Sequence, residues 1–199
     1  MKKYNHYLLI AASLFVISCG QSDSKKEQAQ ETALADTVKT TDITQIGTDD
    51  AAFVNEAAQG GMMEVQLGQL AQRNALNMDV KKFGAMMAKD HGKANEELKK
   101  LAEGKKMGLP PGLGKDMQDR VDSLSLQSSA GFDLKFMEIM VAAHQKDVAA
   151  FEKASTTLKD ADLKAFVAKT LSVLKMHLTA AESLNASLNK KNAANNKKM

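Results

Sequence analysis

The chain has 199 residues, which is enough for one domain with tails. It contains two prolines and no tryptophan, and the strong helix formers Ala, Leu, Lys, Met, Gln and Glu dominate, so the composition predicts an all-α protein. The formal charge of +3 comes from Lys2, Lys3 and the lysines after residue 189, and the part between these ends is net acidic. This excludes a clustered basic face on the folded part, and we expect no nucleic-acid partner.

Residues 1–18 have the pattern of a secretory signal peptide. Lys2 and Lys3 precede an apolar stretch, residues 8–17, that is too short to span a bilayer. The stretch ends in Val-Ile-Ser-Cys, which is similar to a bacterial lipobox, and Cys19 is the only cysteine. The sequence therefore predicts an exported protein that is anchored in a membrane through acyl chains on Cys19. The alternative is an ordinary signal peptide with an incidental cysteine.

Two polar segments flank the expected domain, which covers residues 48–189. Residues 19–47 are rich in Gln, Ser, Thr, Asp, Lys and Glu without apolar periodicity, which predicts a disordered tether. Residues 190–199 form a basic, Asn-rich and Lys-rich tail that we also expect to be disordered. The tail is either a solvated end or a contact to anionic lipid or cell wall.

Apolar residues at helical spacing predict four long helices within residues 48–189. The first is expected from Thr48, as its capping residue, to about residue 75. The second begins after Asn77 and ends near Lys106, and the short link makes the two antiparallel neighbours. The third covers about residues 131–155, and the fourth follows Asp160 as its cap.

A long connection joins the second and third helices. Gly108 is expected in the left-handed position after the second helix, and Pro110 and Pro111 prevent its continuation. Apolar residues in 113–124 predict a short helix within the connection. So long a connection favours a four-helix bundle with a crossover, in which the second and third helices are parallel.

Each long helix carries one metal-capable residue on its apolar face: Glu64, His91, His144 and His177. Glu64 and His91 lie at almost equal distances from Asn77 along the chain, which predicts that they share one level in the bundle. His144 and His177 lie at less equal distances from the centre of the link between the last two helices, and the mismatch is about one turn, roughly 6 Å. This pattern predicts a transition-metal site of three imidazoles and one carboxylate, suited to zinc, copper, iron or nickel. Asp90 and Asp147 are candidate partners of these ligands, or further oxygen ligands.

Other interpretations of the same residues stay open. The three histidines and Glu64 could form a buried polar network that fixes helix register without metal. Four methionines lie near these positions, and thioethers would suit copper(I), although methionine is also an ordinary filler of helical cores. They are Met63, Met87, Met140 and Met176.

Several glycines lie inside the predicted helices, each costing up to about 1 kcal/mol relative to alanine. We expect them to allow close approach of neighbouring helices, and a kink or room for a ligand near Glu64 is the alternative. They are Gly60, Gly61, Gly68, Gly84 and Gly92.

The segments FVNEAAQGGMMEVQLGQLA, VKKFGAMMAKDHGKANEEL, LPPGL, GFDLKFMEIMVAAHQKDVAAFEKA and LKAFVAKTLSVLKMHLTAAE together resemble the bacterial ferritin-like domain-of-unknown-function family numbered four-one-four-two. The resemblance covers about residues 50–188. It implies a ferritin-like bundle and an outer-membrane or periplasmic location, and no activity. The family's Asp-His pair falls on Asp90 and His91, and its later histidines fall on His144 and His177.

The sequence departs from di-iron carboxylate bundles, which use Glu-x-x-His pairs. Ala88 and Leu174 stand where such glutamates would precede His91 and His177, so di-iron oxidase or iron-storage chemistry is not expected.

The leading interpretation is a lipid-anchored cell-envelope protein, at the outer membrane facing the periplasm, that binds a transition metal such as zinc, copper or iron in stress defence or metal handling. The alternative is a non-catalytic structural or interaction module. We expect no enzyme, because no nucleophile constellation, phosphate loop or paired-carboxylate signature is recognised. Protein partners are open, and so is the oligomeric state, with a homo-oligomer among the options.

Overall fold

The structure is a computed structural model that describes residues 47–127 and 129–197, all within one compact unit of the chain, Ile43–Met199. These residues form five helices and no strand, which confirms the all-α prediction. The helices are α1 (Thr48–Asn74), α2 (Met78–Gly104), α3 (Lys115–Ser125), α4 (Ser129–Thr157) and α5 (Ala161–Asn196). The predicted signal peptide, Cys19 and the tether up to residue 46 lie outside the described residues.

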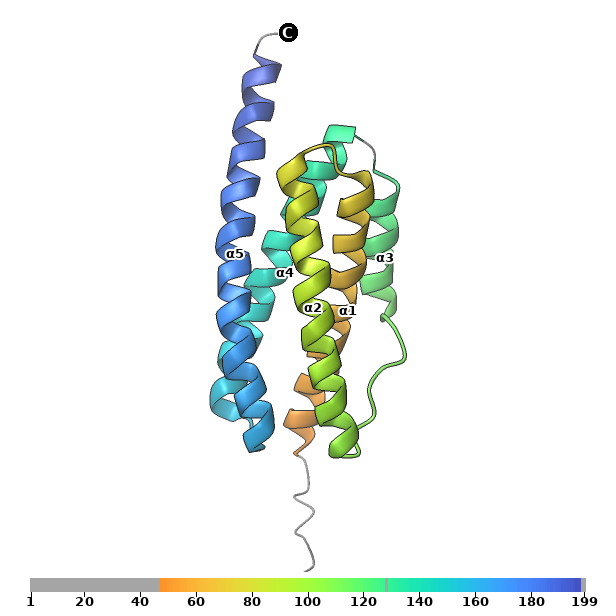
Figure 1. Cartoon of the computed structure of the whole chain (residues 1–199), viewed down its shortest axis with the longest axis vertical. Helices are drawn as coiled ribbons and strands as arrows, with labels where there is room; N and C mark the ends of the chain where they lie inside the picture. The colour runs from red at the N-terminus through yellow and green to blue at the C-terminus, as the bar shows by residue number, and fades with distance from the viewer. Residues whose placement is uncertain (1–46, 128, 198–199) are drawn as a thin grey trace, which may run out of the picture. The chain divides into compact units, whose positions relative to one another are not determined.

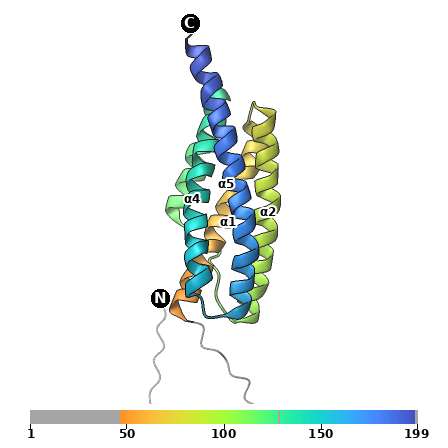
Figure 2. The same cartoon turned by 90° about the vertical axis from the view of Figure 1, so that its left-hand side faces the viewer.

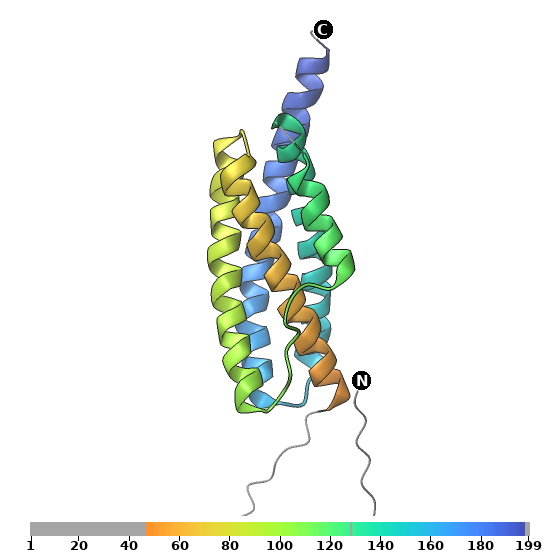
Figure 3. The same cartoon turned by 90° about the vertical axis from the view of Figure 1, so that its right-hand side faces the viewer.

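The four long helices form two antiparallel hairpins, α1–α2 and α4–α5, whose turns lie at opposite ends of the molecule (Figure 1). The hairpins pack against each other through α1 on α4 and α2 on α5. The connection after α2 returns along the outside, where α3 packs on α1 and α4 (Figure 3). The predicted short helix in the long connection is confirmed, and α2 and α4 run parallel as expected. Within the described ranges, none of the helices combines the length and apolar character needed to cross a bilayer.

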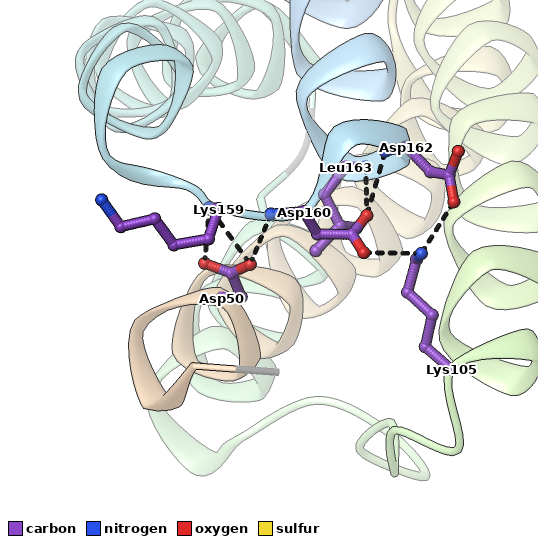
Figure 4. A network of polar contacts seen from close by, with 6 residues as sticks. All are labelled: Asp50, Lys105, Lys159, Asp160, Asp162 and Leu163. Atoms are coloured by element: carbon purple, nitrogen blue, oxygen red, sulfur yellow. Dashed lines mark hydrogen bonds and ion pairs between the residues drawn. The ribbon is translucent and has the colours of Figure 1, made fainter. Parts of the chain in front are cut away.

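Each hairpin turn is held by a buried carboxylate from the other hairpin. Asp133 of α4 accepts hydrogen bonds from the two backbone N–H groups that precede α2, at 3.0 and 2.8 Å. At the opposite end, Asp50 of α1 accepts from the two that precede α5, with 3.1 Å to the nitrogen of Asp160 (Figure 4). Lys105, just after α2, bridges Asp160 and Asp162 at 2.7 Å each. These contacts join helix ends that are remote in sequence.

The two hairpins are copies of one pattern. Asn77 caps α2 and Asp160 caps α5, each accepting from the backbone N–H groups two and three residues later. Asn77 and Asp160 are separated by as many residues as Asp50 and Asp133 are. The segments that begin at the two caps, NMDVKKF and DADLKAF, have Asp, a branched apolar residue, Lys and Phe at matching positions. The two turns lie at opposite ends of the molecule, so the two hairpins repeat this pattern in opposite directions (Figures 1 and 2).

The apolar core consists of two clusters stacked along the helices. One contains Phe83, Phe132 and Phe136 with the methionines of α2 and α4, and lies toward the α1–α2 turn. The other contains Phe151 and Phe166 and lies toward the α4–α5 turn. On α2, α4 and α5, the predicted metal-capable residue falls between the segments that build these two clusters, and on α1 Glu64 directly follows Met63, where the first cluster begins. The site is therefore a polar layer inside an apolar core.

Several local predictions differ from the structure. The residue before α1 is Gly47, which makes no side-chain cap, so Thr48 is inside the helix rather than its cap. The left-handed residue after α2 is Lys106, with φ of 56°, and not Gly108, because Met107 N bonds back to Ala102 O at 2.9 Å and closes the helix earlier.

The expected disordered tail is also different. α5 continues through Asn196, so residues 190–196 are helical and exposed. The physical reason is propagation: once a helix is nucleated by packing, each added residue such as Lys or Ala extends it at little cost.

Candidate metal centre

The four residues predicted from the sequence come together in the polar layer. His144 and His177 have no exposed surface, Glu64 is 1% exposed and His91 is 6% exposed. Glu64 and His91 do share one level, as their equal distances from Asn77 predicted, because Glu64 Oε2 lies 2.8 Å from His91 Nδ1. The ring centroids of His144 and His177 are 5.4 Å apart despite the expected offset of one turn.

One nitrogen of each histidine has a hydrogen-bond acceptor on its outer side. His91 Nδ1 faces Glu64 Oε2, His144 Nδ1 lies 3.0 Å from the backbone oxygen of Met140, and His177 Nε2 lies 3.2 Å from Asp90 Oδ2. Carbonyl and carboxylate oxygens only accept hydrogen bonds, so each of these nitrogens carries the proton. The other nitrogen of each ring then holds a lone pair.

Those second nitrogens are buried and unpaired. His91 Nε2, His144 Nε2 and His177 Nδ1 have no hydrogen-bond partner among the residues that the structure describes. One nitrogen from each of the three rings belongs to a group whose members all lie within 4.8 Å of one another. The arrangement matches the outer hydrogen bonds that orient histidine ligands around metals.

The spacing of the rings also fits a shared metal. The three ring centroids are each 5.4 Å from the other two. A zinc ion about 2.0–2.1 Å from each nitrogen would lie roughly 3.2 Å from each ring centroid. Two such rings would then have centroids about 5.2 Å apart in tetrahedral geometry and about 5.5 Å apart in trigonal geometry. The centroid spacing is therefore compatible with one shared ion, and the rings would turn to bring their nitrogens, which lie within 4.8 Å of one another, closer together.

Burial keeps the three rings neutral. It lowers the pKa of His91 to about 4 and also lowers the pKa values of His144 and His177, and the nearby carboxylates oppose this effect only in part. A neutral imidazole offers its lone pair without first losing a proton. At neutral pH the rings are thus in the state that binds a metal ion.

Glu64 and Asp147 form a second element of the layer. The oxygens of Glu64 lie against the outer nitrogens of His91 and His144, and Glu64 is not part of the three-nitrogen group. Burial raises the pKa of Glu64, and burial followed by the charge of Glu64 raises the pKa of Asp147 to about 8.

A small cavity of about 30 Å³ lies beside this pair and is also lined by His91, Asn95 and Thr170. Asn95 and Thr170 were not predicted from the sequence. The pairing of Glu64 with Asp147 had a usable signal there, because these two residues are separated by the same number of residues as Asp50 and Asp133 and so occupy equivalent positions of the two hairpins. Asp90, in contrast, was expected near the site and contacts His177.

The glycines and methionines divide into two groups each. A Cβ on Gly68 would lie 2.5 Å from a backbone oxygen of Gly84, so these two glycines permit close approach of α1 and α2, as expected. At Gly61 the neighbour is the side chain of Asn95, and at Gly60 it is Asp147, so this pair makes room beside Glu64. Three of the four methionines near the site, Met63, Met87 and Met140, are buried core residues. The fourth, Met176, is 54% exposed.

Comparisons with known proteins place the chain in a family. No curated protein and no solved structure matches it. A family model described as "Domain of unknown function (DUF4142)" matches residues 35–184, which include all six residues predicted for the site. The chain therefore belongs to the family DUF4142.

Proposed function

We propose that this protein binds one transition-metal ion through His91, His144 and His177, within a ferritin-like four-helix bundle that is held at the cell envelope by a lipid on Cys19. The unpaired inner nitrogens of the three histidines carry this proposal. In a purely structural polar network they would remain unsatisfied, at about 1–3 kcal/mol for each buried group. A metal ion satisfies all three at once.

The donor set selects the class of metal. Three imidazoles suit zinc, copper, iron or nickel, and the outer partners Glu64, Asp90 and the Met140 carbonyl orient the rings. Glu64 has this orienting role in the proposal, in place of the ligand role expected from the sequence. Three protein ligands leave a fourth position for water or an exogenous ligand around zinc.

Metal handling or stress defence in the envelope is the role that fits such a site best. The donor set does not resemble the carboxylate-rich di-iron arrangement, because the three-nitrogen group contains no carboxylate. The envelope location is supported by the signal-like residues 1–18 and by Cys19 in its lipobox-like context. Cys19→Ala should release the protein from the membrane fraction and abolish its labelling by radioactive fatty acid.

A competition titration tests the metal site. Protein that begins after Cys19 and carries no affinity-tag histidines is stripped with a chelator and titrated with zinc against a coloured chelator. We expect one tight equivalent, which is lost in His144→Gln and His177→Gln. Lys146→Gln serves as a control, because this exposed residue on α4 pairs with Glu56. Absence of zinc, copper, iron and nickel binding in the folded protein would refute the proposal.

A further inference from the structure

The acid pair beside the histidines has features that the three-histidine site does not use. Glu64 Oε1 is fully buried, and as a carboxylate oxygen it has no hydrogen-bond donor among the described residues. It lies 3.2 Å from His144 Nδ1, but that nitrogen is hydrogen bonded to the Met140 carbonyl. Glu64 also lines the cavity of about 30 Å³, together with Asp147.

The walls of this cavity supply further oxygen atoms. The amide oxygen of Asn95 occupies the space that a side chain at Gly61 would take, and Asp147 Oδ1 lies 3.7 Å from where a Cβ at Gly60 would be. Thr170 also lines the cavity with a hydroxyl group. The adjacent glycines cost helix stability, up to about 1 kcal/mol each, and this oxygen-lined space is what they leave open.

The polar lining of this cavity is acidic. It includes the carboxyl groups of Glu64 and Asp147 and no lysine or arginine. The volume is sufficient for a water-sized guest and excludes an organic ligand.

We propose that Glu64, Asp147 and Asn95 hold a second divalent cation through oxygen atoms, next to the three-histidine site and distinct from it. Oxygen donors of this kind favour Mn²⁺ or Mg²⁺ over the softer ions that imidazoles select. The protein thus has two neighbouring positions of different chemistry, one of nitrogen and one of oxygen atoms. Glu64 connects them, because its Oε2 orients His91 while the same side chain lines the second position and its Oε1 has no hydrogen-bond partner among the described residues.

The test uses Mn²⁺ as the probe and follows the electron paramagnetic resonance signal of the free ion. Chelator-stripped protein is titrated with Mn²⁺ both before and after loading with one equivalent of zinc. We expect one Mn²⁺ to bind without releasing zinc. Asp147→Asn, which keeps the shape of the side chain, should weaken Mn²⁺ binding by about tenfold or more while zinc stoichiometry stays the same.

Two further variants control this result. Glu152→Gln changes an exposed carboxylate on the same helix, paired with Lys175, and should bind Mn²⁺ like the wild type. Gly61→Ala keeps all charges but puts a methyl group into the space that the amide oxygen of Asn95 occupies, and should weaken Mn²⁺ binding. Binding of Mn²⁺ without binding of zinc, copper, iron or nickel would refute the three-histidine proposal and leave the second site standing. No bound Mn²⁺, or equal Mn²⁺ binding by Asp147→Asn, would refute the second site.

Discussion

Replacing Glu64 by glutamine should weaken zinc binding at the three-histidine site by roughly 10–100-fold. Glu64 Oε2 lies 2.8 Å from His91 Nδ1, a short charge-assisted hydrogen bond that fixes the ring and raises its basicity. Its other oxygen lies 3.2 Å from His144 Nδ1, so the charge acts on two of the three ligands. We therefore expect the upper half of this range, a loss of about 2–2.7 kcal/mol in binding free energy.

The assay is the zinc competition titration at neutral pH, with the change in melting temperature on adding zinc as a second measurement. Ligands that bind the native state raise the melting temperature by mass action, so the shift should be smaller in Glu64→Gln. Glu56→Gln on the same helix is the matched control, because its exposed pair with Lys146 at 2.7 Å has little energetic value. Zinc affinity that stays within about threefold of the wild type would refute the orienting role of Glu64.

Three further predictions concern stability of the metal-free protein. Asp133→Ala leaves two backbone N–H groups of the α1–α2 turn unpaired and should cost about 1–3 kcal/mol in urea unfolding; a loss below about 0.5 would contradict the capping role. Gly68→Ala puts a Cβ 2.5 Å from a backbone oxygen of α2 and should lower the free energy of unfolding by about 1–3 kcal/mol. In Gly92→Ala the added Cβ meets nothing within 4 Å, and the free energy of unfolding should rise by up to about 1 kcal/mol. Equal effects of the two substitutions would contradict the close packing at Gly68. The pH dependence follows from two opposite contributions. The pKa of His91 is lowered from 6.5 to about 4, so the unfolded chain binds the extra proton and stability should fall as the pH drops from about 6.5 to 4, by up to about 1.4 kcal/mol per pH unit for each such histidine. The pKa of Asp147 is raised from 3.8 to about 8, so its contribution is full below pH 3.8 and is lost as the pH rises toward 8. Below pH 6.5 these two contributions nearly cancel, but burial also lowers the pKa values of His144 and His177, and together these outweigh Glu64, whose pKa burial raises. Stability should therefore be greatest near pH 6.5, and thermal melts that show monotonic dependence from pH 4.5 to 8.5 would contradict these assignments.

The site could be predicted from sequence to the level of which residues meet. Helical spacing placed Glu64, His91, His144 and His177 on apolar faces, and the tight turn at Asn77 fixed the level of the first two. These inferences depend on local geometry, which a single sequence contains. The roles within the site could not be predicted, because they depend on which way each ring is turned. That choice is set by acceptors such as the Met140 carbonyl and Asp90, on the same helix and on another.

The fold shows the same limit. The short helix in the long connection and the caps Asn77 and Asp160 follow from local sequence and are confirmed. Asp50 lies in the first turn of α1, yet it is buried and caps the start of α5, which is far away along the chain. Such contacts depend on how the hairpins pack. The equal separation of Asp50 from Asp133 and of Asn77 from Asp160 was present in the sequence and would have indicated them.

The metal content of the protein tests the central claim most directly. Protein that begins after Cys19 is purified without chelator or affinity-tag histidines, analysed for its elements, and then melted with and without added zinc, copper, iron and nickel. Binding at His91, His144 and His177 predicts close to one transition-metal ion per chain and a raised melting temperature with the preferred metal. No bound metal and an unchanged melting temperature with all four ions would show that these histidines are a structural polar layer.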